Sequence, residues 1–251
     1  MNRPDRGAAS PDPDGLLLVD KPPGMTSHDV VYKIRRTFCL QKVGHGGTLD
    51  PAATGLLVLL IGRGTKASDQ VMAGDKIYEG EVTLGADTST QDAEGEIIAQ
   101  HDPSGVTREA FAAELRKWVG NVEQTPPMVS AVKIGGKRLY KLAREGVTVE
   151  RQPRPVTIHS LDLLDWNPPR ATLRMHCTKG TYVRTLAADV GAGLGVGGHL
   201  SALRRIASGD YHVDHALPLD QLLALAPPAL AARLLPLPPK PAAPAPEASR
   251  S

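Results

Sequence analysis

The residues with the clearest capacity for chemistry lie in a loop at residues 42–55, where Asp50 is the only carboxylate. The loop holds four glycines, and His45 stands five residues before Asp50. Glycine adopts positive φ and lets a ligand or a second backbone come close, so this loop is shaped for contact rather than packing. Asp followed by Pro also suits a helix start, where Asp accepts from free N–H groups and Pro takes the first helical position. Spacing alone therefore leaves Asp50 as a helix cap or a catalytic carboxylate, and His45 as a turn residue or a ligand.

Two further side chains have the chemistry to act with such a carboxylate. Tyr78 falls on the apolar face of a strand predicted at residues 76–85, so it is either a core tyrosine or a ring on which a base can stack. Arg184 falls in the first turn of a helix predicted to begin after Thr181, where a cation is mildly unfavourable against the helix dipole. Because local rules are most often broken at functional sites, Arg184 is interpreted either as the partner of an acid or as a solvated side chain.

A cluster of basic residues surrounds Tyr140. Its members are Lys133, Lys137, Arg138, Lys141 and Arg144. A charge run is usually a solvated helix face, and the alternative is contact with phosphates, which positions RNA without reading its sequence. The net charge of the whole chain is only +2. An RNA-binding surface would therefore have to come from local clusters of this kind.

The composition excludes several classes of protein. With 251 residues, of which 41% are hydrophobic and 22% charged, the chain has the make-up of a soluble globular protein with one large domain or two small ones. It has no apolar run of the ~20 residues that span a bilayer. The N-terminus shows no apolar signal-peptide core, so we expect a cytoplasmic protein. Cys39 and Cys177 lie far apart without CxxC spacing, which argues against a zinc site and a disulfide scaffold.

Apolar periodicity predicts the elements that must position these residues, as a mixture of strands and helices with several hairpins. Strands are expected at residues 16–19, 55–61, 76–85, 128–134, 156–166 and 171–177, with another beginning at residue 97. Helices are expected at residues 27–37, 66–72 and 107–119 and after residue 181, with Ser27, Thr107 and Thr181 as caps. We expect a disordered tail at residues 1–14, a folded domain at residues 15–226 and an Ala/Pro-rich tail at residues 227–251.

The stretch Gly44-His45-Gly46-Gly47-Thr48-Leu49-Asp50-Pro51-Ala52-Ala53-Thr54-Gly55 resembles the signature of the TruB family of tRNA pseudouridine synthases. The usual family pattern has Thr where this chain has Gly46, a change in loop stiffness rather than in chemistry. Residues 21–24, 128–146, 179–186 and 199–209 resemble further family segments in the same order. The resemblance implies an α+β fold, the pseudouridine synthase fold, with a large mixed and mostly antiparallel sheet flanked by helices.

The resemblance also assigns roles to single residues of the expected catalytic domain. Asp50 matches the family's catalytic nucleophile, and Arg184 is the candidate cation that keeps it ionised in a dry pocket. Their proximity rests on the resemblance, because they lie far apart in the sequence. Tyr78 would stack on a uracil flipped out of the RNA, and Tyr182 would line the pocket and could serve in proton transfer at C5. Leu203 matches a residue that lies against the target uracil.

Two more residues are expected near the substrate. His45 would insert into the gap that the flipped base leaves in the RNA, and Lys21 would pack near the loop of Asp50. The implied substrate is uridine 55 in the T loop of tRNA. Its conversion to pseudouridine is an isomerisation, so no cofactor and no metal are expected. We expect a monomer that needs no guide RNA and does not bind membranes. Too few residues follow the catalytic domain for the RNA-binding PUA domain of many bacterial relatives.

Three other interpretations remain. A guide-dependent catalytic subunit, like the archaeal and eukaryotic relatives, would carry a PUA domain for which this chain has no room. A non-catalytic tRNA-binding or folding factor of the same fold predicts that Asp50 is dispensable. A glycoside or nucleoside hydrolase would need a second carboxylate near the first, and no such pair flanks Asp50.

Overall fold

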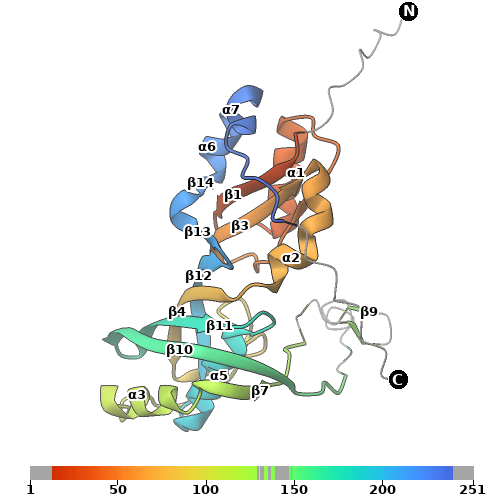
Figure 1. Ribbon diagram of the computed structural model, residues 1–251. Coiled ribbons are helices and arrows are strands. Elements are labelled where there is room, and N and C mark those ends of the chain that lie inside the picture. The colour runs from red at the N-terminus through yellow and green to blue at the C-terminus, as the bar shows by residue number, and fades with distance from the viewer. Residues whose placement is uncertain are drawn as a thin grey trace, which may run out of the picture.

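A computed structural model describes residues 13–128, 130, 133–134, 137–138, 147 and 149–239, with the backbone alone at 133–134 and 137–138. Its main feature is a ten-stranded sheet (Figure 1). Along the sheet the order is β14 (Leu217–Pro218), β1 (Gly15–Lys21), β3 (Thr54–Ile61), β12 (Gly198–Ser208), β4 (Lys76–Leu84), β11 (Arg170–Cys177), β10 (Arg154–Asn167) and β7 (Gly120–Gln124). The short strands β2 (Val43–His45) and β13 (Tyr211–His212) pair with β3 and β12. Of these pairings, β1–β14 and β3–β12 are parallel and the others antiparallel, which confirms the expected mixed, mostly antiparallel sheet.

Helices cover the sheet in two groups (Figure 1). Beside β1 and β3 lie α1 (Ser27–Thr37), η1 (Gly62–Ala67), α2 (Ser68–Ala73), α6 (Leu219–Leu223) and α7 (Pro227–Ala231). Beside β4, β11, β10 and β7 lie α3 (Arg108–Arg116) and α5 (Val183–Gly193). Two small ribbons, β5 (Ala86–Thr88) with β6 (Ile97–Gln100) and β8 (Lys133–Ile134) with β9 (Lys137–Arg138), and the single turn η2 (Val213–His215) complete the described elements.

The two groups of elements have separate hydrophobic cores. Strands β1 and β3 are buried along almost their whole length, because one core lies on each of their faces. In β11 burial alternates instead, with Leu173, Met175 and Cys177 turned toward α5 and the intervening side chains toward the other face. Tyr78 and Leu203 pack against the core beside α1 and against the core beside α5. These two residues therefore mark the junction between the two halves of the molecule.

Three residues that the sequence offered as helix caps do not cap a helix in the structure. The cap of α1 is Thr26 rather than Ser27, because Thr26 and Asp29 form a reciprocal capping box. Thr181 does not cap α5, since its hydroxyl donates to the carbonyl of Thr178 and Tyr182 holds the cap position. No helix follows Asp50, because the chain turns at Pro51 and enters β3 at once. The interpretation of Asp50 as a helix cap is therefore wrong.

The packed chain extends beyond both expected domain ends. Residues 227–231 form α7, whose Leu230 is buried, and Leu235 pairs with Leu16 of β1 through two backbone hydrogen bonds. At the other end Asp14, placed in the expected tail, accepts from the backbone N–H of Arg63. The expected boundaries at residues 15 and 226 therefore fall inside the packed region, which reaches at least from Asp14 to Leu235.

Other predictions fall partly outside the described residues. Lys141, Arg144 and Tyr140 of the basic cluster lie outside them, as do residues 129, 131 and 132 of the expected strand at residues 128–134 and the ends of both expected tails. For the described residues, none of the helices has the length and apolar character needed to cross a membrane.

Candidate active site

The loop that carries Asp50 is held on both sides of the carboxylate by side chains from β1 and α1. The hydroxyl of Ser27 accepts from the N–H of Leu49 at 2.8 Å and donates to its carbonyl at 3.2 Å. The fully buried Nζ of Lys21 donates to the carbonyl of Pro51 at 3.1 Å, and to those of Pro22 and Met25. The residues just before and just after Asp50 are thus fixed to the scaffold, so the carboxylate projects from a rigid turn.

A third anchor comes from β12. The guanidinium of Arg205, which is 2% exposed, donates to the carbonyls of Leu56, Thr48 and Gly47 at 2.7, 3.3 and 3.1 Å. The close packing of β3 against β12 there requires glycine at position 55, where φ is +92° and a Cβ would lie 2.3 Å from the carbonyl oxygen of Arg205. Arg205 therefore ties the glycine-rich loop to the strand that crosses the middle of the sheet.

The structure brings Asp50 and Arg184 together. Nη2 of Arg184 lies 2.8 Å from Oδ2 of Asp50, and Nη1 lies 3.3 Å from Oδ2 of Asp92. The Arg184 side chain is 6% exposed, whereas that of Asp50 is 42% exposed. The carboxylate is therefore open to a substrate while its cationic partner is covered, and the second carboxylate fixes the direction of the guanidinium.

Asp92 and Gln124 position this pair, although the sequence did not single them out. The loop that carries Asp92 is docked on β12, where the N–H of Ala93 donates to the carbonyl of Leu200 at 3.0 Å. The buried side-chain amide of Gln124 contacts the backbone N–H and carbonyl of Tyr182, the residue that caps α5. Arg184 follows two residues later, so β7 sets the place where its helix begins.

The charges around Asp50 act on its ionisation in opposite directions. Burial raises the pKa of the Asp50 carboxyl, while the guanidinium of Arg184 lowers it, Asp92 raises it and Lys21 lowers it. Burial also lowers the pKa of Lys21 to about 8. An ionised Asp50 in this partly buried place therefore depends on its nearest cation, Arg184.

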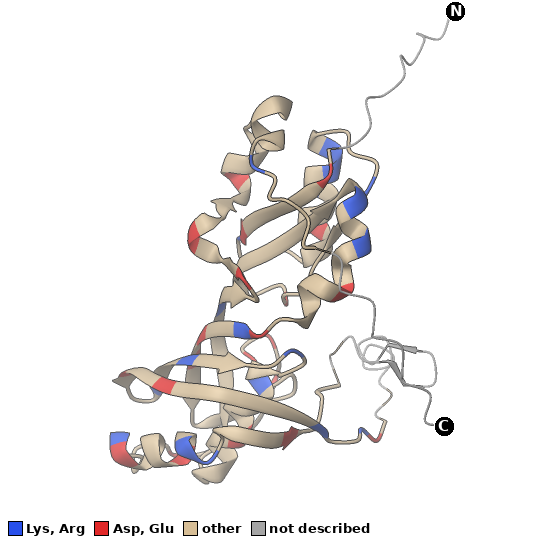
Figure 2. Ribbon diagram, in the orientation of Figure 1, with Lys and Arg blue, Asp and Glu red and all other residues tan. Residues whose placement is uncertain are grey.

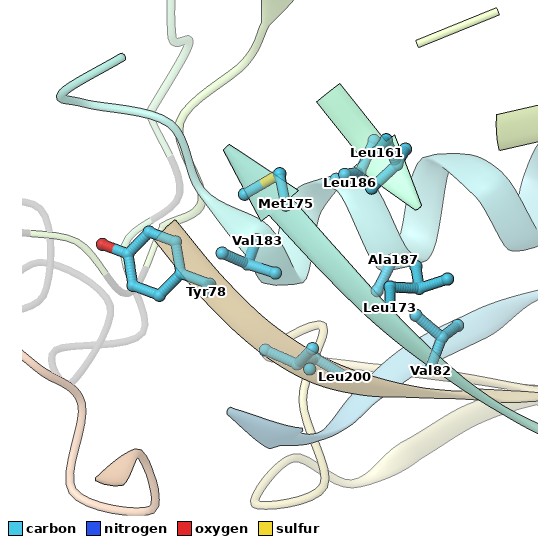
Figure 3. Close-up of a pocket in the computed structure, with 10 residues that line it drawn as sticks. Tyr78, Val82, Leu161, Leu173, Met175, Val183, Leu186, Ala187 and Leu200 are labelled. Carbon is cyan, nitrogen blue, oxygen red and sulfur yellow. The ribbon is translucent and has the colours of Figure 1, made fainter. Parts of the chain in front are cut away.

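A cleft of about 680 Å³ opens beside the pair, and Asp50, Arg184, Tyr78, Tyr182 and Leu203 all line it. Tyr78 stands at the end of an apolar group between β4, β11 and α5, and its hydroxyl points away from that group (Figure 3). Burial raises the pKa of the Tyr78 phenol. Because the phenol stays protonated near neutral pH, its position favours contact through the ring rather than proton removal by a phenolate.

The cleft concentrates positive charge that the whole molecule lacks. Figure 2 shows acidic and basic positions interspersed over both halves of the ribbon. Among the described residues that line the cleft, the cations outnumber the acids Asp50 and Asp69. These cations are Lys76, Arg154, Lys179, Arg184 and Arg205. Such a lining attracts a polyanion to the place where Asp50 is exposed.

Lys21 and His45 lie outside the described lining of the cleft. Lys21 contacts the loop of Asp50 through the carbonyl of Pro51, and because it is fully buried a substrate cannot reach it. His45 is half-buried at the end of β2, and burial lowers the pKa of its imidazole, which keeps the ring neutral near pH 7. At the neighbouring Gly46 a Cβ would lie 2.4 Å from Cγ1 of Val71, so Val71 occupies the space that a larger residue in the loop would need.

The fold and the site together define a class of protein. An ion-paired carboxylate at the rim of a cationic, tyrosine-bearing cleft suits chemistry on an RNA base, and the fold is that of the pseudouridine synthases. In "Crystal Structure of a Cbf5-Nop10-Gar1 Complex" a chain matches 90% of this chain with a TM-score of 0.71 and 26% identity. In "Structure of H/ACA RNP bound to a substrate RNA containing 2'-deoxyuridine" the match covers 83%, with a TM-score of 0.63 and 25% identity. This chain spans only 60% and 52% of the lengths of those two chains.

The family is more specific than the class. Residues 35–183 match the model "TruB family pseudouridylate synthase (N terminal domain)", and residues 184–238 match "tRNA pseudouridylate synthase B C-terminal domain". A tRNA pseudouridine synthase B of Symbiobacterium thermophilum is 51% identical over 92% of this chain and 79% of its own. One of Opitutus terrae is 47% identical over 89% of this chain and 93% of its own. The chain belongs to the TruB family, as the sequence motifs predicted.

Proposed function

We propose that this protein isomerises uridine to pseudouridine in tRNA, at position 55 of the T loop. The family and the name that the curated relatives share, tRNA pseudouridine synthase B, support the reaction and the substrate. The observation that carries the proposal is the ion pair of Asp50 and Arg184 at 2.8 Å, with the carboxylate exposed to a cleft and the guanidinium covered.

The proposed reaction breaks the bond between the ribose C1′ and N1 of uracil and forms a bond between C1′ and C5. The C5 proton is lost and N1 gains a proton, so atoms and electrons balance without an oxidant, a reductant or a cofactor. The Asp50 carboxylate attacks the sugar or the base, or assists proton removal, and it must be ionised to do so. Arg184 favours that ionised form and fixes its orientation.

The target base must leave the stack of the T loop, which costs a few kcal/mol. In the proposal the ring of Tyr78 stacks on the extruded uracil, and such stacking contributes about 1–3 kcal/mol per base. Leu203 packs against the same ring, and Tyr182 closes the cleft with its hydroxyl available for proton transfer at C5. All three residues line the cleft of Asp50, which supports these roles. His45 fills the gap left in the RNA.

We further infer that the protein acts on tRNA in the cytoplasm as a monomer without a guide RNA. Its relatives at about 50% identity are named as tRNA enzymes, whereas the H/ACA complex members resemble it at 25–26%. The alternative is a tRNA-binding or folding factor of the same fold, for which the exposed carboxylate would have no use.

Incubating the purified protein with unmodified tRNA transcript and mapping pseudouridine tests the proposal. Product at position 55 alone, formed without added RNA, is the expected result. Product that appears only after adding cellular small RNA would show dependence on a guide. Tight tRNA binding without any product would favour the folding-factor alternative and reject the proposed reaction.

A further inference from the structure

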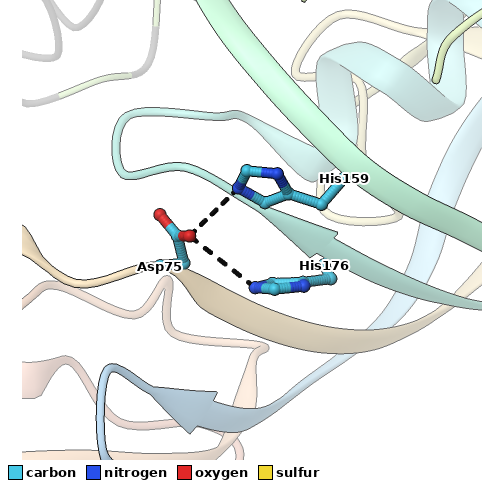
Figure 4. A group of neighbouring side chains, drawn as sticks. All are labelled: Asp75, His159 and His176. Carbon is cyan, nitrogen blue, oxygen red and sulfur yellow. Dashed lines mark ion pairs between the residues drawn. The ribbon is translucent and has the colours of Figure 1, made fainter. Parts of the chain in front are cut away.

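A second group of chemically active side chains lies outside the cleft. Asp75, His159 and His176 meet on the face of the sheet opposite the core beside α5 (Figure 4). Oδ2 of Asp75 lies 3.0 Å from Nε2 of His159 and 3.8 Å from Nε2 of His176. One ligand atom from each of the three residues lies within 4.8 Å of the others. Two ligands of a tetrahedral Zn²⁺ lie about 3.3 Å apart, so small side-chain movements would bring all three into its coordination sphere.

The backbone holds two of the three residues in neighbouring strands and the third at the start of another strand, since His159 lies in β10 and His176 in β11. Asp75 directly precedes β4, and its carbonyl accepts from the N–H of Gly209 at 2.8 Å. In the pairing of β10 with β11, Ile158 faces Cys177 and Ser160 faces His176, so His159 is the extra residue of a β-bulge. Bulges direct side chains at particular places on a sheet. Here the bulge sets the imidazole of His159 beside that of His176, with ring centroids 4.6 Å apart.

The local charge favours a cation over an anion. The carboxylate of Asp75 lies between the two imidazoles and would repel a phosphate. The neighbouring Lys76 does not compete for it, because Nζ of Lys76 turns back to the carbonyls of Met72 and Gly74. Each of the three side chains is 37–43% exposed, so an ion can enter from solvent. Two imidazoles and one carboxylate suit Zn²⁺ and its transition-metal neighbours, whereas Mg²⁺ and Ca²⁺ prefer oxygen ligands.

We propose that Asp75, His159 and His176 bind one divalent transition-metal ion of the Zn²⁺ type, with water at the remaining position. The ion would join β4, β10 and β11 next to the cleft, since Lys76 follows Asp75 and Thr178 lies two residues after His176. The ion would therefore stabilise the packing of these three strands and would take no part in the chemistry of Asp50.

Calorimetric titration of the chelator-treated, tag-free protein with Zn²⁺ tests the site. The expected result is one equivalent bound, with affinity reduced roughly tenfold or more in His176→Gln and in Asp75→Asn. The matched control is His101→Gln, because His101 pairs with Asp87 at 3.2 Å as a single His–Asp pair. This control should bind Zn²⁺ like the wild type.

Thermal unfolding gives a second readout that does not depend on activity. Zn²⁺ should raise the melting temperature of the wild type and of His101→Gln, and a chelator should reverse the rise, because an ion that binds the folded state stabilises it. Adding Zn²⁺ should leave the melting temperature of His176→Gln unchanged. Equal affinity in wild type and His176→Gln, an equal loss in His101→Gln, or the absence of a thermal shift in the wild type overturns the proposal.

Discussion

At the scale of single residues, two neighbours of Asp50 act on its pKa in opposite directions. Arg184 lowers this pKa and Asp92 raises it. If the ionised form reacts, the single-turnover rate rises with pH through this pKa. Removing the cation in Arg184→Gln should therefore shift the acid limb of the pH–rate profile to higher pH and lower the plateau. Removing the anion in Asp92→Asn should shift the limb to lower pH.

Single-turnover rates measured across pH 4–9 on unmodified tRNA transcript would separate the two variants. Shifts in the same direction, or a limb that neither substitution moves, would contradict the role of Asp50 as the ionised group that reacts. The melting temperature of each variant serves as the control, because Arg184 is buried and its loss also affects folding.

Tyr78 offers a second prediction at this scale. If its ring stacks on the flipped base, Tyr78→Leu should slow the single-turnover rate roughly ten- to hundredfold, with a much smaller effect on tRNA affinity. Tyr78→Phe keeps the ring and should keep most of the rate. Rate constants and filter-binding affinities for both variants provide the measurement. Parallel losses of rate and affinity, or equal effects of Leu and Phe, would argue against stacking.

At the scale of elements, two neighbouring residues at the start of helix α1 have different tasks. Ser27 holds the loop of Asp50, and Thr26 caps the helix. Ser27→Ala removes both hydrogen bonds to Leu49, which leaves a buried N–H unsatisfied at a cost of about 1–3 kcal/mol. Thr26→Ala removes only the cap, which costs about 1 kcal/mol. Both should lower the free energy of unfolding in urea, but only Ser27→Ala should also slow turnover. A loss of turnover in both would place the effect in the helix rather than in the loop.

The sequence predicted the elements better than it predicted their contacts. Val30, Val31 and Ile34 recur at helical spacing in the sequence and form the buried face of α1. Cys177 ends the alternating apolar pattern of the strand expected at residues 171–177 and is buried in its core. The role of Asp92 was not predicted, because it lies in a polar connection without periodicity. It contacts Arg184, which is 92 residues away in the sequence. Only the folded chain places such distant residues side by side.

Arg205 was also missed, although the sequence held a signal for it. Arg204 and Arg205 are consecutive in β12, a strand that the apolar pattern did not predict, and successive side chains of a strand point to opposite faces. One of the two therefore had to face the interior, where a guanidinium needs several acceptors. The structure places Arg205 there, against three loop carbonyls, while Arg204 pairs with Asp20.

At the scale of the whole molecule, the cleft lies where the two cores meet, and its positive charge should dominate the binding of tRNA. Each phosphate contact that is lost should reduce the slope of log affinity against log salt by about one or less. Lys179→Ala and Arg154→Ala, both exposed in the cleft, should weaken binding in this way without changing the rate at saturating tRNA.

Arg174→Ala is the matched control for these two substitutions, because Arg174 is also exposed but pairs with Glu79 outside the described lining of the cleft. Affinities measured at several salt concentrations should be the same for this variant and the wild type. If all three substitutions reduce the salt slope equally, the tRNA does not occupy the cleft in the proposed way.

The proposed isomerisation depends most on Asp50 as the reacting carboxylate, and the single-turnover rate of Asp50→Asn on unmodified tRNA tests this role. The predicted result is a loss of at least about a thousandfold in the rate of pseudouridine formation, with tRNA affinity and melting temperature close to those of the wild type. Asp69→Asn is the matched control. Asp69 also lines the cleft, but among the described residues the ion pairs of Arg184 are with Asp50 and Asp92 and not with Asp69. This variant should keep the rate within about tenfold of the wild type. Pseudouridine formed by Asp50→Asn at the wild-type rate would contradict the role of Asp50 as the reacting carboxylate.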